Sequence, residues 1–230
     1  MLLAVLGGGT RAAAQTAAPS VVEQFWPEID YYQRLGEHSR FYGSAGYTVG
    51  ETKQLSEAQY GGNLDLFLTA QPPLGKVFGA GSLAMDRRLP AMLRLGYRYA
   101  QGVSDGEPYH QQRLIAELTL RTMLGRLVAS DRHGVDWRWT DGVYSTRYRN
   151  RMYVEHPVGS QRYEATPYAA AEVFYVITGQ YWSSVKYELG VQLPVVSHFT
   201  VELYLSRQNF WGATDDPAID AVGTNFVLSW

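Results

Sequence analysis

Residues 144–156 of the chain, YSTRYRNRMYVEH, place Arg147, Arg149 and Arg151 at every second position. A spacing of two residues is the period of a β-strand, so the three arginines share one face of a predicted strand. The stretch has two interpretations. It is either a basic patch that binds a polyanion or the face of a strand that points into a polar interior.

The overall composition argues against the first interpretation. The 230 residues include 20 basic and 22 acidic side chains, a net charge of −2, whereas a nucleic-acid-binding protein normally carries a basic excess. We therefore expect no nucleic-acid partner. The chain has no cysteine, which excludes disulfides and thiolate metal sites. Its 17 Tyr, 6 Trp, 8 Phe and 23 Gly are typical of many strands joined by tight turns.

The same two-residue alternation recurs along the chain. Apolar and polar faces alternate clearly in residues 93–100, 113–121, 168–177, 185–193, 199–206 and 222–230. A less regular form of the pattern covers residues 29–35, 41–49 and 60–70. Gly, Pro, Asp and Ser clusters separate these segments, and no segment of useful length has a helical period. The pattern predicts a single all-β domain over residues 21–230.

Three properties favour a transmembrane barrel over a soluble sandwich. The apolar faces are long enough for a tilted strand to cross a bilayer, the opposite faces carry mid-strand charges, and aromatic residues gather near strand ends. A charge facing lipid at mid-depth costs about 2–4 kcal/mol, which an inward orientation avoids. We predict a closed antiparallel transmembrane β-barrel in the outer membrane of a Gram-negative bacterium, in contact with outer-membrane lipids. A soluble secreted barrel that binds a ligand is an alternative.

The number of strands is harder to predict. A single-chain bacterial barrel with both termini in the periplasm needs an even number of strands, and eleven segments fit the pattern. A further strand within residues 76–85 (KVFGAGSLAM) brings the prediction to twelve, with ten as the alternative. In this arrangement the loop over residues 208–220 is extracellular.

The two ends of the chain carry features of export and assembly. In residues 1–20 a short apolar run leads to small residues, and cleavage near Ala14/Gln15 is expected. These residues are predicted to form a signal peptide and a short disordered lead. At the other end, Trp230 closes the last apolar face and resembles the end by which the barrel-assembly machinery recognises outer-membrane barrels. The protein is expected to be a monomer.

Several longer motifs carry a resemblance to a known family. They are SDRHGVDWRWTDGVYSTRYRNRMYVEH (130–156), TPYAAAEVFY (166–175), YELGVQLPV (187–195) and LYLSRQN (203–209). Together they resemble an uncharacterised Gram-negative family, domain of unknown function 2490. The resemblance implies an outer-membrane β-barrel but brings no activity and no catalytic residues. The chain departs from the family pattern at His133-Gly134, Val176 and Trp230.

The predicted inward charges are the best lead to function. The lumen-facing residues are Arg94, Arg98, Arg113, Glu117, Arg147, Arg149, Arg151, Glu155, Glu172, Lys186, Glu188 and Glu202. Arginine forks pair with carboxylates in two-point contacts, so these side chains either select solutes in a porin-like passage or fill the lumen. The near balance of charge favours a narrow or plugged channel, or a structural envelope protein.

A membrane-embedded lipid-modifying enzyme is the alternative function, of the phospholipase or lipid A-modifying type. Such an enzyme needs His beside Ser and a third polar group. Ser197 and His198 point to opposite faces of a strand, as do Ser130 and His133. We therefore assign no catalytic residue and expect no enzymatic activity. We also expect no metal site and no cofactor, because no motif of suitable spacing is present.

Overall fold

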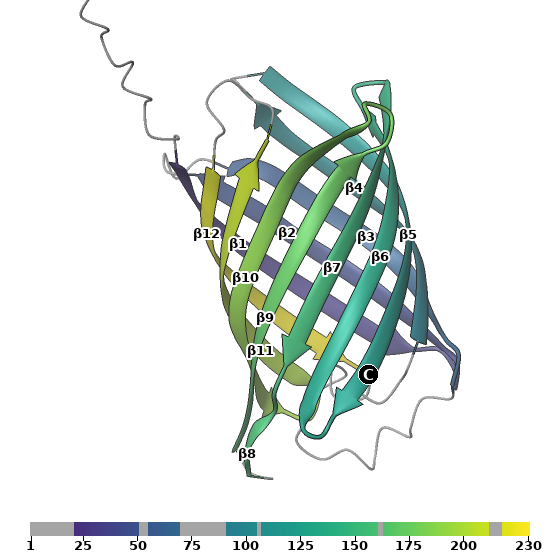
Figure 1. Ribbon diagram of the computed structural model, residues 1–230, viewed down its shortest axis with the longest axis vertical. Coiled ribbons are helices and arrows are strands. Elements are labelled where there is room, and N and C mark those ends of the chain that lie inside the picture. Colours follow the sequence, from purple (N-terminus) through teal and green to yellow (C-terminus); the bar gives the residue numbers. More distant parts are fainter. Residues whose placement is uncertain (1–20, 51–54, 70–90, 105–106, 161–162, 212–217) are drawn as a thin grey trace, which may run out of the picture.

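The computed structural model describes residues 21–50, 55–69, 91–104, 107–160, 163–211 and 218–230, and these form strands and short turns (Figure 1). The predicted signal peptide and the predicted strand over residues 76–85 lie outside the described residues. The strands are β1 (Val21–Arg34), β2 (Ser39–Gly50), β3 (Leu55–Phe67), β4 (Ala91–Ser104), β5 (Glu107–Leu124), β6 (Leu127–Thr140), β7 (Val143–Glu155), β8 (Val158–Ser160), β9 (Tyr163–Val176), β10 (Tyr181–Val196), β11 (Phe199–Phe210) and β12 (Ala218–Ser229).

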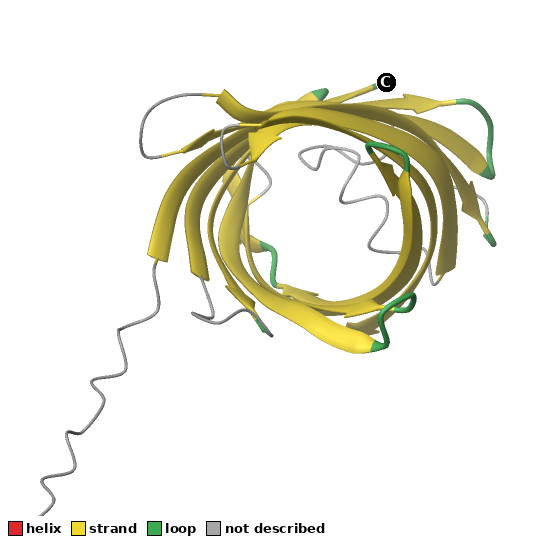
Figure 2. Cartoon of the chain, turned by 90° about the horizontal axis from the view of Figure 1, so that it is seen from above, coloured by secondary structure: helices red, strands yellow, loops and turns green. Residues whose placement is uncertain are grey.

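The sheet closes on itself, which confirms the prediction of a barrel of about twelve strands. The order β10-β11-β12-β1-β2-β3-β4-β5-β6-β7-β9 returns to its start through pairing of β9 with β10. Eleven of the twelve described strands thus form the wall, and viewed along the barrel they enclose a ring (Figure 2). The twelfth, β8, is a three-residue strand that pairs only with residues 163–165 at the start of β9.

One seam differs from the predicted antiparallel arrangement. β1 pairs with β12 in parallel, from Val21 beside Ala218 to Tyr32 beside Ser229, while every other pairing is antiparallel. The reason is geometric, because an odd number of wall strands that alternate in direction makes the first and last strands run the same way. The beginning of β1 and the end of β12 therefore lie at opposite ends of the barrel (Figure 1), where an even-numbered wall would bring them together.

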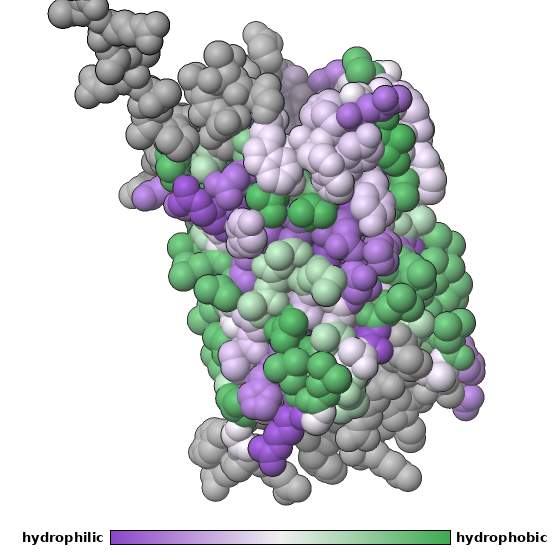
Figure 3. Space-filling model, viewed as in Figure 1, coloured by the Kyte–Doolittle hydropathy of each residue, from purple (hydrophilic) through white to green (hydrophobic). Residues whose placement is uncertain are grey.

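The wall is apolar outside and polar inside. Successive side chains of a strand point to opposite faces, so the alternation in sequence becomes two surfaces. Outward positions expose large apolar side chains, with Leu95 45 % and Leu205 61 % exposed, whereas the inward Asp65 and Glu117 are buried. Hydrophobic residues cover both flanks of the wall in Figure 3. No helix in the described ranges is long and apolar enough to cross a membrane.

Large inward side chains lie over glycines on the next strand. The ring of Tyr204 lies where a Cβ at Gly223 would stand, and Tyr168 occupies the same place beside Gly190. Each tyrosine is the register partner of its glycine, so the missing side chain leaves room for the ring against the wall. We infer that these glycines are required sterically.

An aromatic cluster fills part of the interior near the end at which β12 finishes. Tyr32 stacks on Tyr42 with ring centroids 4.7 Å apart. The guanidinium of Arg40 lies 4.4 Å from the ring centre of Tyr32 and 5.2 Å from that of Phe67, a cation–π arrangement. This packing narrows the lumen beside β1, β2 and β3.

Candidate functional site

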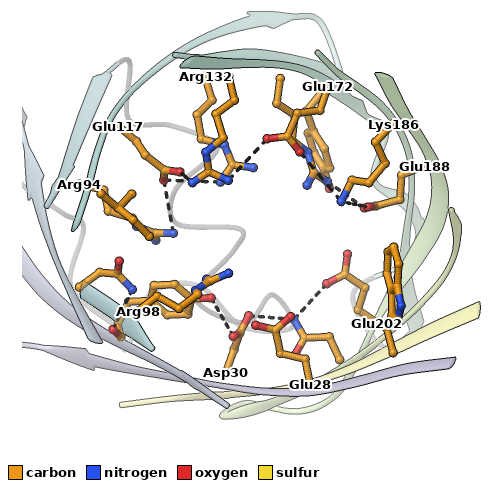
Figure 4. Close-up of a pocket in the computed structure, with 18 of the residues that line it drawn as sticks. Glu28, Asp30, Arg94, Arg98, Glu117, Arg132, Glu172, Lys186, Glu188 and Glu202 are labelled. Carbon is orange, nitrogen blue, oxygen red and sulfur yellow. Dashed lines mark hydrogen bonds and ion pairs between the residues drawn. The ribbon is translucent and has the colours of Figure 1, made fainter. Parts of the chain in front are cut away.

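The interior of the barrel encloses a cavity of about 500 Å³ lined by residues from all eleven wall strands. Its lining includes all twelve of the predicted lumen-facing residues: Arg94, Arg98, Arg113, Glu117, Arg147, Arg149, Arg151, Glu155, Glu172, Lys186, Glu188 and Glu202. Figure 4 labels some of these side chains, which point into the cavity from different strands: Arg94, Arg98, Glu117, Glu172, Lys186, Glu188 and Glu202. Residues that are far apart in sequence therefore share one polar space.

Arg149 on β7 is the centre of the charge network. Its guanidinium pairs with Glu117 on β5 through a short contact, and it lies 3.4 Å from Asp136 and 3.5 Å from Glu172. The three carboxylates are at most 4 % exposed, and Arg149 itself is 18 % exposed. Because Glu117, Asp136 and Glu172 lie on three different strands, this one side chain links a large part of the wall.

The network continues in both directions around the barrel. On one side, Arg94 lies 3.9 Å from Glu117 and 2.6 Å from Asp65, which also binds Arg40 at 2.6 Å. Arg132 approaches Glu117 at 3.7 Å. The chain of alternating charges therefore runs from β2 to β7.

On the other side of Arg149, Lys186 on β10 bridges two carboxylates, at 3.9 Å from Glu172 and 3.3 Å from Glu188. Arg151 donates to Glu188 at 2.8 Å, and Tyr168 donates to the same carboxylate at 3.0 Å. We call this continuous series of ion pairs, from Arg40 to Glu188, the charge belt.

The arginine ladder at 147–151 belongs to this belt. Arg147 donates to Asp136 at 2.8 Å, so each of the three ladder arginines has a carboxylate partner. The alternation of the ladder therefore indicates a strand face in a polar interior rather than a patch that binds a polyanion. Its three arginines form ion pairs that link different strands of the wall.

Sequence reasoning predicted Glu202 but missed Glu28 and Asp30, the other two carboxylates of an acidic wall opposite the belt. Glu28 and Asp30 of β1 lie beside Glu202 of β11 along one side of the cavity (Figure 4). Asp30 accepts hydrogen bonds from Tyr42 and from Asn225, each at 2.8 Å. The alternation of large polar residues at even positions of β1 is the sequence pattern that indicates this face.

A second polar group lies on the outside of the wall. Nε2 of His133 is 3.0 Å from a carboxylate oxygen of Asp131, and Nδ1 is 2.8 Å from the hydroxyl of Tyr148. Asn150 donates to Asp131 at 2.5 Å. We call these four residues the outer polar cluster. Their register neighbours on β5, β7 and β9 include four apolar side chains, Leu118, Leu120, Met152 and Val173, and Tyr175 lies beside Tyr148.

These features define a class of protein, a closed β-barrel with an apolar outer wall and a charged internal cavity. The chain belongs to the family described as "Protein of unknown function (DUF2490)", whose model matches residues 23–218. No curated protein and no solved structure matches the chain. The family membership agrees with the resemblance in the sequence motifs.

Proposed function

We propose that the protein is an outer-membrane β-barrel of a Gram-negative bacterium, with a narrow interior passage for small charged solutes. The observation that carries this proposal is the opposed polarity of the two faces of one closed wall. Large exposed apolar residues cover the outside, and buried ion pairs line a cavity of about 500 Å³ inside. Backbone N–H and C=O groups find no water in the bilayer core, and closure of the sheet gives them hydrogen-bond partners on neighbouring strands.

The arrangement of charges inside the barrel favours transport of solutes over a lumen that side chains simply plug. Basic residues dominate β4 to β7, while Glu28, Asp30 and Glu202 lie on β1 and β11. Walls of opposite sign around a cavity of this size are suited to selecting small charged solutes. The belt and the aromatic cluster keep the passage narrow, so large solutes are excluded.

Conductance across a planar bilayer tests the passage. We expect the purified protein to give small ohmic steps, well below those of a wide porin, because long side chains occupy much of the lumen. Heat-modifiable migration on a detergent gel provides the control for folding. A folded, inserted protein that conducts no ions would contradict the passage and would leave a structural envelope protein with a plugged lumen.

The membrane partners follow from the same proposal. The outer wall would contact outer-membrane lipids, and Trp230 would present the end recognised by the barrel-assembly machinery. Trp230 lies on the outer wall at the seam, where its amide donates to the carbonyl of Tyr32 at 2.9 Å and its ring stacks on His198. We propose that each monomer forms one complete barrel, because the wall closes within a single chain.

The outer polar cluster favours a second candidate function, a lipid-modifying enzyme. Asp131 and Tyr148 contact the two nitrogens of His133, an arrangement through which a proton can move between the phenol and the carboxylate. The cluster is on the face that would meet lipid, where His133 is 42 % exposed. Ionisable groups in such a place are costly and commonly functional.

Incubation with labelled phospholipid or lipopolysaccharide tests this second function. If the cluster is catalytic, His133→Leu should lower turnover roughly a hundredfold or more, the effect of losing a general acid–base group. His156→Leu, at the end of the same strand pair, is the matched control and should leave turnover unchanged. Absence of turnover in the wild-type protein, or equal turnover in both variants, would exclude the enzyme.

A further inference from the structure

Three arginines lie side by side across neighbouring strands, on the inner face of the wall. Arg98 on β4 is the register partner of Arg113 on β5, and Arg113 is the register partner of Arg138 on β6. Adjacent strands are about 4.8 Å apart, so the row brings three positive charges close together. Like charges directly opposite each other destabilise a sheet. We call these residues the arginine row.

Among the described residues, no carboxylate lies within ion-pair distance of the arginine row. Within the described ranges, Arg98 donates to the amide oxygen of Gln59 at 3.4 Å, and Arg113 donates to the amide oxygen of Gln111. The buried Nε atoms of Arg98 and Arg138 have no hydrogen-bond partner in the described structure. Burying a charge without an ion-pair partner costs free energy, so a bound anion would stabilise the arginine row.

The neighbours of the row show why it differs from the charge belt. Arg94 and Arg98 share the inner face of β4, but Arg94 stands between Asp65 and Glu117 in register. Arg98 stands between Gly61 and Arg113. The register neighbours at the two ends of the row, Gly61 on β3 and Ser145 on β7, are therefore uncharged.

We propose that the arginine row binds a small multivalent oxyanion, such as a phosphate-bearing solute. The planar forks of arginine match the oxygens of phosphate in two-point contacts, which a single lysine ammonium does not reproduce. Arg98 and Arg113 line the cavity of about 500 Å³, a volume suited to a small solute. The inference rests on the proposed passage in one respect, since it names the class of solute that the passage selects.

Binding of inorganic phosphate and diphosphate to the detergent-solubilised protein, measured by calorimetry in phosphate-free buffer, tests the site. We expect one saturable site with tighter binding of diphosphate. Arg98→Gln, Arg113→Gln and Arg138→Gln should each weaken binding roughly ten- to a hundredfold, the factor for losing a charge-assisted hydrogen bond. Arg207→Gln is the matched control. The substitution removes the same charge, but Arg207 lies on the outer wall, away from the arginine row. No saturable binding, or equal binding by the triple Gln variant, overturns the proposal.

Two further measurements separate a ligand site from a structural role and from the passage. Without phosphate, the triple Gln variant should unfold at a urea concentration no lower than the wild type, since the change removes like-charge repulsion. A markedly lower midpoint would mean that the arginines are structural and would overturn the site. In bilayers, the same variant should shift the reversal potential toward cation preference. If the protein binds phosphate but conducts no ions, the anion site is supported and the passage is contradicted. If it conducts ions but binds no phosphate, the passage is supported and the anion site is contradicted.

Discussion

Replacing Arg149 with Met should destabilise the barrel by about 3–5 kcal/mol, the cost of removing one partner from a buried ion pair. Arg149 pairs with Glu117, Asp136 and Glu172, all nearly inaccessible to water. The substitution leaves these carboxylates without the cation that they share. Reversible urea unfolding in detergent or lipid vesicles gives the free energy of unfolding.

The matched control for this prediction is Arg207→Met. Arg207 and its partner Asp220 are 49 % and 43 % exposed, so their ion pair contributes about 0–1 kcal/mol. The double variant Arg149→Met with Glu117→Gln should lose less than the sum of the two single changes, because each removes the partner of the other. Equal effects of Arg149→Met and Arg207→Met would show that the charge belt does not stabilise the barrel.

Replacing Leu95 with Arg should destabilise the membrane-inserted barrel by about 2–4 kcal/mol, because the charge would face lipid near mid-depth. Leu95 points outward from the middle of β4, between the apolar residues Leu64 and Ala116 on the neighbouring strands. Unfolding by urea from lipid vesicles measures the loss.

Leu124→Arg supplies the comparison for Leu95→Arg. Leu124 also points outward, but it is the last residue of β5, where a charge reaches the interface and costs about 0–1 kcal/mol. The difference between the two variants reports depth in the bilayer rather than the change in residue type. If both lose the same free energy, the wall does not have a lipid-buried middle at Leu95.

The sequence predicts which way the side chains point better than it predicts what they meet. Alternation alone assigns Arg147, Arg149 and Arg151 to one face of a strand. Their partners depend on register and closure, and the carboxylate of Glu188 reaches Arg151 from a strand 37 positions away. No local pattern contains that pairing.

The same limit applies to the arginine row and to the parallel seam. Arg94 and Arg98 are indistinguishable in sequence, both inward on β4, yet register gives one Asp65 and Glu117 as neighbours and the other Gly61 and Arg113. The parallel seam depends on the total number of wall strands, a property of the whole chain. Neither feature could be predicted from any single segment.

Lipid exposure along β5 tests most directly the central claim that the outer wall lies in a membrane. Because the chain has no cysteine, single substitutions to Cys at the outward Leu114 and Leu118 and at the inward Ile115 and Thr119 can each carry one fluorophore. In vesicles of brominated lipid, we predict strong quenching at positions 114 and 118 and weak quenching at 115 and 119. Equal exposure of all four positions to an aqueous quencher, without quenching by lipid, would contradict the claim and indicate a soluble barrel.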